Sequence, residues 1–275
     1  MTEAGPRHGR VRGNGLHLHY VEWGEPGNRT VLLLHGFASS TWSSWRALGQ
    51  RLGERFHVVG LDLRGHGESD RDPAARYTLR DYAGDIETAL PALGQPPQTV
   101  IGHSMGGRLA LLYAARHHET LERLVLVDSK VEGGRSRPDM IASYPERFAT
   151  VAEADAFAER IYGRRKHRFE YEFVRNADGT VDWRFDLVGQ RRSRSGPDPV
   201  LDEGQWAQFG ALRTPTLVVR SGRSGAILPA DVVRMHELNP ATRTVEYESA
   251  GHLLHLDEPE RFWSDVTSFL TADQS

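Results

Sequence analysis

The chain has 275 residues, of which 39% are hydrophobic, with no cysteine and a formal net charge of −3. This composition excludes a disordered chain, disulfide bonds and thiolate metal sites, and gives no electrostatic reason to expect binding to nucleic acid or to a membrane surface. No apolar run approaches the ~18 residues of a membrane helix, and residues 1–15 lack the apolar segment of a secretory signal. We therefore expect a cytoplasmic protein.

Short apolar runs alternate with helical patterns along most of the chain. Residues 16–23 alternate apolar and polar side chains after the turn Gly13-Asn14-Gly15, which predicts an N-terminal β-hairpin. Continuous apolar runs predict buried strands, and they occur at 30–34, 58–61, 99–101, 124–127, 216–219 and 245–247. Apolar residues at helical spacing predict helices at 41–55, 79–93, 105–117, 229–238 and 259–270.

This alternation indicates an α/β fold with a mostly parallel sheet and helices on both of its faces. Right-handed crossovers then bring the carboxyl ends of the parallel strands to one edge, where ligand sites of such sheets lie. The residues that follow the strands therefore carry most of the functional information. They are His35-Gly36-Phe37, Asp62, His103-Ser104-Met105, Asp128, Ser221–Gly225 and Gly251-His252.

Residues 130–207 interrupt the pattern, because they are rich in charged and aromatic side chains and lack a buried-strand run. We interpret this stretch as an inserted, mainly helical cap on a core formed by residues 1–129 and 208–275. Its aromatic residues could line a pocket or form the cap's own core; they include Tyr144, Phe148, Trp183, Phe185 and Trp206. A basic cluster is interspersed with acidic residues, which indicates a solvated helix face rather than nucleic-acid binding; it comprises Arg160, Arg164, Arg165, Lys166 and Arg168.

The segment Gly102–Gly107 fits the G-x-S-x-G nucleophile elbow, and it lies between a predicted strand and a predicted helix as that motif requires. Such a turn holds its serine in a strained backbone conformation, so small residues are needed at positions 102 and 106. The hydroxyl group of Ser104 then projects freely near the positive end of the helix. We predict Ser104 as a nucleophile; alone, the motif could also be a chance strand–turn–helix junction.

A serine hydroxyl needs a base that removes its proton, and we expect a histidine late in the chain. His252 follows the strand predicted at 245–247, and Gly251 before it permits a sharp turn. His255 is the alternative, but its position favours packing at the beginning of the last helix. We predict His252 as the general base.

The negative charge that develops on the substrate oxygen needs two preset backbone donors. One should be the amide of Met105, which follows the nucleophile. The other should be the amide of Phe37, in the loop after the first buried strand. A simpler interpretation of His35-Gly36 is that it only terminates that strand.

Together these segments resemble the α/β-hydrolase superfamily. The matching pieces are His35-Gly36-Phe37, Asp62–Ser69, Gly102–Gly107, and Gly251-His252 with Glu258-Pro259 after it. The resemblance implies no metal and no organic cofactor. It does not define the substrate, because the superfamily includes esterases, lipases, thioesterases, lactonases and carbon–carbon bond hydrolases. Its epoxide hydrolases and haloalkane dehalogenases use an aspartate nucleophile, and Ser104 argues against both.

The acid that orients the histidine departs from the family's usual pattern. Most members have an aspartate after the penultimate strand, but Arg220–Pro229 contains no carboxylate, and Asp231 falls inside a predicted helix. Asp128 ends the strand next to the nucleophile strand, from which a minority of members take their acid. We predict Asp128, with Glu248 as the alternative; an aspartate at 128 could also serve only hydrogen bonding.

We therefore expect a serine hydrolase that cleaves a small to medium carboxylic ester or lactone through an acyl-enzyme on Ser104. A thioesterase or a carbon–carbon bond hydrolase would use the same residues. A protein of another class, which binds a ligand on this fold but is catalytically weak, is favoured by the missing usual acid. The sequence leaves the natural substrate, its stereochemistry and the oligomeric state undefined.

Overall fold

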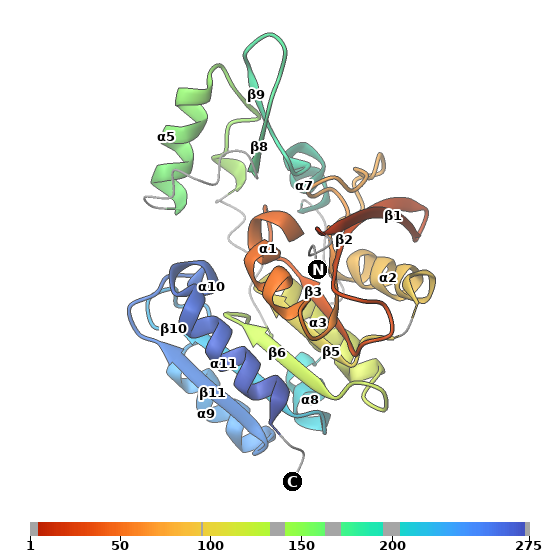
Figure 1. Cartoon of the computed structure of the whole chain (residues 1–275). Coiled ribbons are helices and arrows are strands. Elements are labelled where there is room, and N and C mark those ends of the chain that lie inside the picture. The colour runs from red at the N-terminus through yellow and green to blue at the C-terminus, as the bar shows by residue number, and fades with distance from the viewer. Residues whose placement is uncertain (1–4, 95, 133–140, 163–171, 195–203, 273–275) are drawn as a thin grey trace.

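The computed structural model describes residues 5–94, 96–132, 141–162, 172–194 and 204–272. An eight-stranded sheet in the order β1-β2-β4-β3-β5-β6-β10-β11 forms its centre (Figure 1). The pairs β1–β2 and β2–β4 are antiparallel, and the remaining neighbours are parallel. The strands are β1 (Arg7–Gly13), β2 (Leu16–Trp23), β3 (Thr30–Leu34), β4 (His57–Leu61), β5 (Thr99–His103), β6 (Arg123–Val127), β10 (Thr216–Ser221) and β11 (Thr242–Tyr247).

Helices cover both faces of this sheet, which confirms the predicted fold class. One face packs against α1 (Thr41–Leu52), α10 (Leu254–Asp257) and α11 (Pro259–Thr271). The opposite face packs against α2 (Leu79–Ala89), α3 (Met105–Arg116), α8 (Gln205–Ala211) and α9 (Pro229–Leu238).

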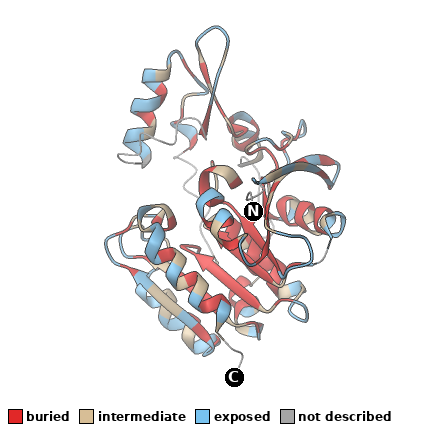
Figure 2. Ribbon diagram, viewed as in Figure 1, coloured by how far each residue is buried: buried red, intermediate tan, exposed pale blue. Residues whose placement is uncertain are grey.

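The central strands β3, β4, β5 and β6 are buried along their whole length (Figure 2). Successive side chains of a strand point to opposite faces, so Leu32 joins the core under α2 and α3, whereas Leu33 joins the core under α1 and α11. Each fully buried leucine or valine contributes ~1.5–3 kcal/mol. This two-sided burial explains why these strands read as continuous apolar runs.

The predicted elements of the core are present, with small differences at their ends. The helix predicted at 79–93 divides into α2 and the 3₁₀ helix η1 (Leu90–Leu93). Pro91 accounts for this division, because proline has no backbone N–H to continue α-helical hydrogen bonding. The N-terminal hairpin turns at Asn14 and Gly15, both with positive φ, as the turn sequence predicted.

The described part of residues 130–207 contains a small sheet in addition to the helices that we expected. Strands β7 (Arg147–Phe148), β9 (Val181–Trp183) and β8 (Phe173–Arg175) pair antiparallel in that order. Helices α5 (Val151–Tyr162) and α7 (Leu187–Arg194) accompany them, and α5, β8 and β9 project above the main sheet in Figure 1.

Aromatic side chains hold this part of the chain together. Tyr144, Phe148, Trp183 and Phe185 belong to one buried cluster, in which Tyr144 and Trp183 stack with ring centroids 5.2 Å apart. Trp206 instead packs in the main core, because α8 lies against α3. The cap limits 130 and 207 stay a prediction, as does the role of the basic cluster. In that cluster the Arg160 guanidinium lies over the Phe157 ring, whereas Arg164, Arg165, Lys166 and Arg168 are outside the described residues.

Buried hydrogen bonds attach the part of the chain around β7, β8, β9 and α7, which we call the second sheet region, to the core. They lie near the segment after β4. The hydroxyl group of Tyr77 donates to the Asp186 carboxylate at 2.6 Å and accepts from the Asp72 amide at 2.9 Å. The Asp186 amide donates to the Gly65 carbonyl at 2.7 Å. These contacts fix Phe185, the neighbour of Asp186, over the carboxyl edge of the main sheet.

Candidate active site

Ser104 occupies a strained turn between β5 and α3, with φ +52° and ψ −115°. A non-glycine residue in this region costs ~1–3 kcal/mol unless its surroundings impose it. The amide of Ser104 donates to the Val127 carbonyl at 2.9 Å, and its carbonyl accepts from the Ser129 hydroxyl at 2.9 Å. These bonds hold the turn in place, and they leave the side chain free of helix capping.

Close backbone contacts explain why glycine is needed on both sides of Ser104. A Cβ atom at Gly102 would overlap the carbonyl group of Gly106, and one at Gly106 would overlap the carbonyl oxygen of Leu34. Any larger residue would push α3 away from β3 and β5. Small residues were predicted at these two positions for this steric reason.

The fold brings Ser104, His252 and Asp128 together, although His252 is 148 residues from the serine. The Nε2 atom of His252 lies 3.0 Å from the Ser104 Oγ atom, and its Nδ1 atom lies 2.7 Å from Asp128 Oδ2. The Asp128 side chain is fully buried, whereas 43% of the His252 side chain is exposed. The carboxylate can therefore orient the ring while the serine and the imidazole stay accessible to a substrate.

Asp128 is held by the end of β10, the strand after which most family members carry their acid. Its Oδ1 atom accepts the Ser221 amide at 3.0 Å, and its own amide donates to the Val219 carbonyl at 2.7 Å. The Ser221 hydroxyl is turned away, donating to the Ala250 carbonyl at 2.7 Å. At the end of β10, backbone groups of Val219 and Ser221 thus position Asp128, and the segment Arg220–Pro229 supplies no carboxylate of its own.

The alternatives to these residues are engaged elsewhere. Asp231 accepts the Leu228 amide at 2.8 Å and caps the beginning of α9. The Glu248 side chain is exposed. His255 is 4% exposed and packs its ring 4.7 Å from the Trp45 ring, as the sequence analysis expected of a packing residue.

The predicted oxyanion donors are the amides of Met105 and Phe37. Met105 begins α3, and the first N–H groups of a helix have no acceptor within it. Phe37 follows Gly36 directly, and a Cβ atom added at Gly36 would lie 3.4 Å from the Cβ atom of Ser104. The loop after β3 therefore runs beside Ser104.

Sequence reasoning missed the role of His103, the residue before Ser104. Its ring is 2% exposed, and its Nε2 atom lies 2.8 Å from the carbonyl oxygen of His252. Because a carbonyl only accepts, Nε2 of His103 carries the proton. This bond links the turn at Ser104 to the loop that carries His252, and no sequence signal joins two residues 149 positions apart.

Sequence reasoning also missed how Asp62 supports the same edge. It accepts the Thr41 amide at 2.7 Å and the Glu68 amide at 3.1 Å, and the His19 ring at 2.8 Å. Burial acts to raise the pKa of Asp62, but the bond with His19 and the other donors outweigh it, so the pKa lies below its ordinary value. The carboxylate thereby fixes the loop after β3 to the segment after β4.

Aromatic rings connect the loop after β3 to the second sheet region. Phe37 packs edge-on against Phe185, with ring centroids 5.3 Å apart, and against His66 at 5.7 Å. The rings of His66 and Phe185 stack at 5.9 Å. The surroundings of Phe37 are thus aromatic and are built from both parts of the chain.

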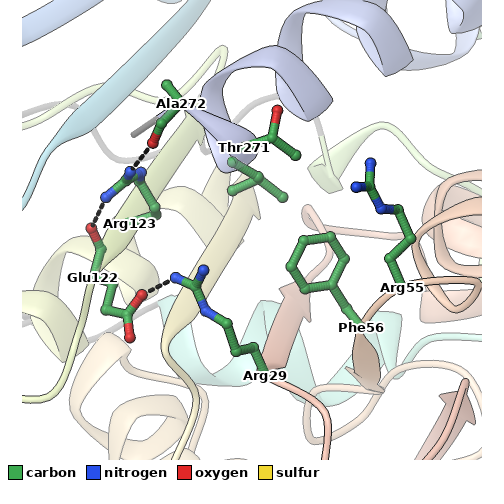
Figure 3. Close-up of a pocket in the computed structure, with 8 residues that line it drawn as sticks. Arg29, Arg55, Phe56, Glu122, Arg123, Thr271 and Ala272 are labelled. Atoms are coloured by element: carbon green, nitrogen blue, oxygen red, sulfur yellow. Dashed lines mark hydrogen bonds and ion pairs between the residues drawn. The ribbon is translucent and has the colours of Figure 1, made fainter. Parts of the chain in front are cut away.

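A cavity of about 710 Å³ lies at the opposite, amino edge of the sheet (Figure 3). Its cationic groups are largely engaged: Arg29 pairs with Glu122, and Arg123 donates to the carbonyl groups of Glu122 and Ala272 at 3.0 and 2.7 Å. It contains none of the predicted site residues, and ligand sites of parallel sheets lie at the carboxyl edge. We therefore place the candidate site at Ser104.

Within the described ranges, no three His, Cys, Asp or Glu side chains gather closely enough to hold a metal ion. Among the helices of the same ranges, none combines the length and the apolar character that crossing a membrane requires.

The fold agrees with comparison to known proteins. A family model of the α/β hydrolase fold matches residues 29–259, so the chain belongs to this family of hydrolases. The N-formylmaleamate deformylase of Pseudomonas putida KT2440 is 30% identical over 267 residues, which cover 95% of this chain and 96% of that protein. The mouse sn-1-specific diacylglycerol lipase ABHD11 is 30% identical over 255 residues, covering 87% of this chain and 80% of the lipase.

Among solved structures, E-2-(acetamidomethylene)succinate hydrolase superposes with a TM-score of 0.83, covering 97% of this chain and 100% of that chain. The two sequences are 23% identical, so this likeness bears on the fold alone.

Proposed function

We propose that the protein is a serine hydrolase that cleaves a small or medium carboxylic ester or lactone through an acyl-enzyme on Ser104. The observation that carries the proposal is the pair of bonds from His252, 3.0 Å to Ser104 and 2.7 Å to Asp128. This is the arrangement that activates a serine nucleophile.

In the proposed reaction, Ser104 attacks the substrate carbonyl while Nε2 of His252 takes the hydroxyl proton. Asp128 holds the proton on Nδ1 and stabilises the imidazolium that forms. The amides of Phe37 and Met105 receive the oxyanion. His252 then protonates the leaving alcohol, and a water molecule, deprotonated by the same ring, releases the acyl group from Ser104.

We favour an ester or lactone because its leaving group is an alcohol, which the proposed serine, histidine and two amide donors can release without further catalytic groups. The contacts among Phe37, Phe185 and His66 form an aromatic cluster beside the proposed oxyanion loop. Aromatic surroundings with a few convergent polar groups suit a substrate with a largely apolar acyl or alcohol part.

A second candidate is the hydrolysis of an acyl amide, and the similarity to N-formylmaleamate deformylase over 95% of the chain favours it. An N-formyl group is an amide, so the same acyl-enzyme would form, and His252 would protonate a nitrogen instead of an oxygen. Thioesters and carbon–carbon bonds would need the same first step.

A substrate panel tests the proposal. We expect p-nitrophenyl acetate or butyrate, or a simple lactone, to be hydrolysed faster than matched thioesters, N-formyl amides and β-diketones. The Ser104→Ala variant should keep its fold and lose turnover of every active substrate. Faster hydrolysis of the N-formyl amides would replace the ester assignment with the second candidate. Undiminished turnover by Ser104→Ala would refute the nucleophile.

A further inference from the structure

His35, the residue before the glycine of the oxyanion loop, is completely buried and uses both ring nitrogens. Its Nδ1 atom lies 2.8 Å from the carbonyl oxygen of Gly36, and its Nε2 atom lies 3.0 Å from the amide nitrogen of Leu63. A residue that merely terminates a strand would need neither contact.

The two partners determine where the ring proton lies. The Leu63 amide can only donate, so Nε2 of His35 must be the unprotonated acceptor. Nδ1 then carries the proton and donates it to the Gly36 carbonyl. Burial lowers the pKa of His35, which keeps the ring in this neutral form, although the Asp62 charge acts in the opposite direction.

The geometry of the peptide bond transmits this contact to Phe37. In a trans peptide the carbonyl group of one residue and the N–H group of the next point in opposite directions within one plane. No cis peptide occurs in the described residues. When His35 holds the Gly36 carbonyl on its own side, the Phe37 N–H is therefore turned to the other side. Gly36 itself lies close to Ser104 and to the His103 ring, because a Cβ atom added to it would meet both.

We propose that His35 is a positioning residue, whose Nδ1–H fixes the Gly36–Phe37 peptide so that the Phe37 amide faces the oxyanion. This inference rests on the proposed function, because it concerns a donor of that reaction. The hydrogen bond from the Leu63 amide supports this role, because it prevents the ring from turning Nε2 toward Gly36.

Two substitutions at position 35 separate this role from a structural one. The amide nitrogen of asparagine takes the place of Nδ1, so His35→Asn keeps a donor for Gly36 and loses the acceptor for Leu63. The amide oxygen of glutamine takes the place of Nε2, so His35→Gln keeps the Leu63 bond and loses the Gly36 bond. Each variant removes one buried hydrogen bond, so the two should lose similar stability.

The readout is kcat and KM for p-nitrophenyl butyrate. Loss of one oriented oxyanion donor costs ~10²–10³-fold in kcat, and we expect this loss in His35→Gln with KM changed less than about threefold. We expect His35→Asn to stay within about tenfold of the wild-type kcat. His57→Gln is a distant control, since this buried histidine bonds Thr30 and Glu22 at the other end of β4. It should lose stability and keep kcat.

Equal kcat losses in His35→Asn and His35→Gln, or a normal kcat in His35→Gln, would overturn the inference and leave the proposed function standing. Failure of the proposed function has a different signature, because the wild type would then hydrolyse no ester and would not react with a fluorophosphonate. If His35→Gln does not fold, nitrogen-15 NMR of the wild-type ring decides the question. A proton on Nδ1 supports the inference, and a proton on Nε2 contradicts it.

Discussion

Replacing Asp128 by asparagine should abolish nearly all turnover while preserving the fold. The side-chain carbonyl oxygen of the introduced asparagine can still accept the Ser221 amide, as Oδ1 of Asp128 does now at 3.0 Å. Its NH₂ group then faces Nδ1 of His252, where a carboxylate oxygen now lies at 2.7 Å. An NH₂ group only donates, so the ring must place its proton on Nε2, and Nε2 can no longer take the proton of Ser104.

Such a tautomer reversal typically lowers kcat ~10⁴-fold, which corresponds to ~5.5 kcal/mol of transition-state free energy at about 1.36 kcal/mol per tenfold change. Because both hydrogen bonds of the side chain survive, the free energy of unfolding should change by no more than about 1 kcal/mol. The assay is the steady-state hydrolysis of p-nitrophenyl butyrate, with urea unfolding measured on the same preparation.

Glu248→Gln is the matched control for this variant. It makes the same carboxylate-to-amide change on an exposed side chain near His252 in sequence, and we expect its kcat to match the wild type. A kcat for Asp128→Asn within tenfold of the wild type would refute the reasoning. A large loss of kcat in Glu248→Gln but not in Asp128→Asn would identify Glu248 as the acid that orients His252.

Two further predictions concern the contacts that support the site. Tyr77→Phe removes the hydroxyl that bridges Asp186 and Asp72, so the free energy of unfolding in urea should fall by ~1–3 kcal/mol; an unchanged value would contradict the bridge. Burial acts to raise the pKa of Asp62, but its bond with His19 and its other donors lower that pKa by more. As the pH falls, the carboxylate is therefore protonated in the unfolded chain before it is protonated in the folded protein. Stability from Asp62 should therefore be present above about pH 4 and lost below it, and Asp62→Asn should show a smaller loss on acidification; an equal loss would disprove this contribution.

The core could be predicted from sequence because its strands are buried on both faces. β3 is the continuous run Thr30–Leu34, and β4 and β6 differ from the predicted ranges by one residue at the first position. The small sheet could not be predicted in this way. β7 has two residues, and its partner β9 lies more than 30 residues later. Such short strands show no periodicity, and long-range pairing defines them.

For the candidate site, sequence order and motif context indicated which strand ends would meet. We predicted Asp128 as the acid because Arg220–Pro229 carries none, but the amide of Ser221 that holds its carboxylate leaves no trace in residue type. The bonds of His35 and His103 to backbone carbonyls are equally invisible. A backbone acceptor is present at every position, so only the fold selects which one a side chain meets.

Covalent labelling tests the central claim most directly. The native protein would be incubated with a fluorophosphonate, digested and analysed by mass spectrometry to locate the adduct. We predict one adduct on the Ser104 hydroxyl, formed far more slowly in the Asp128→Asn variant, with hydrolysis of p-nitrophenyl butyrate lost in proportion to labelling. An adduct on another residue, or full ester turnover by protein whose Ser104 is completely labelled, would contradict the account.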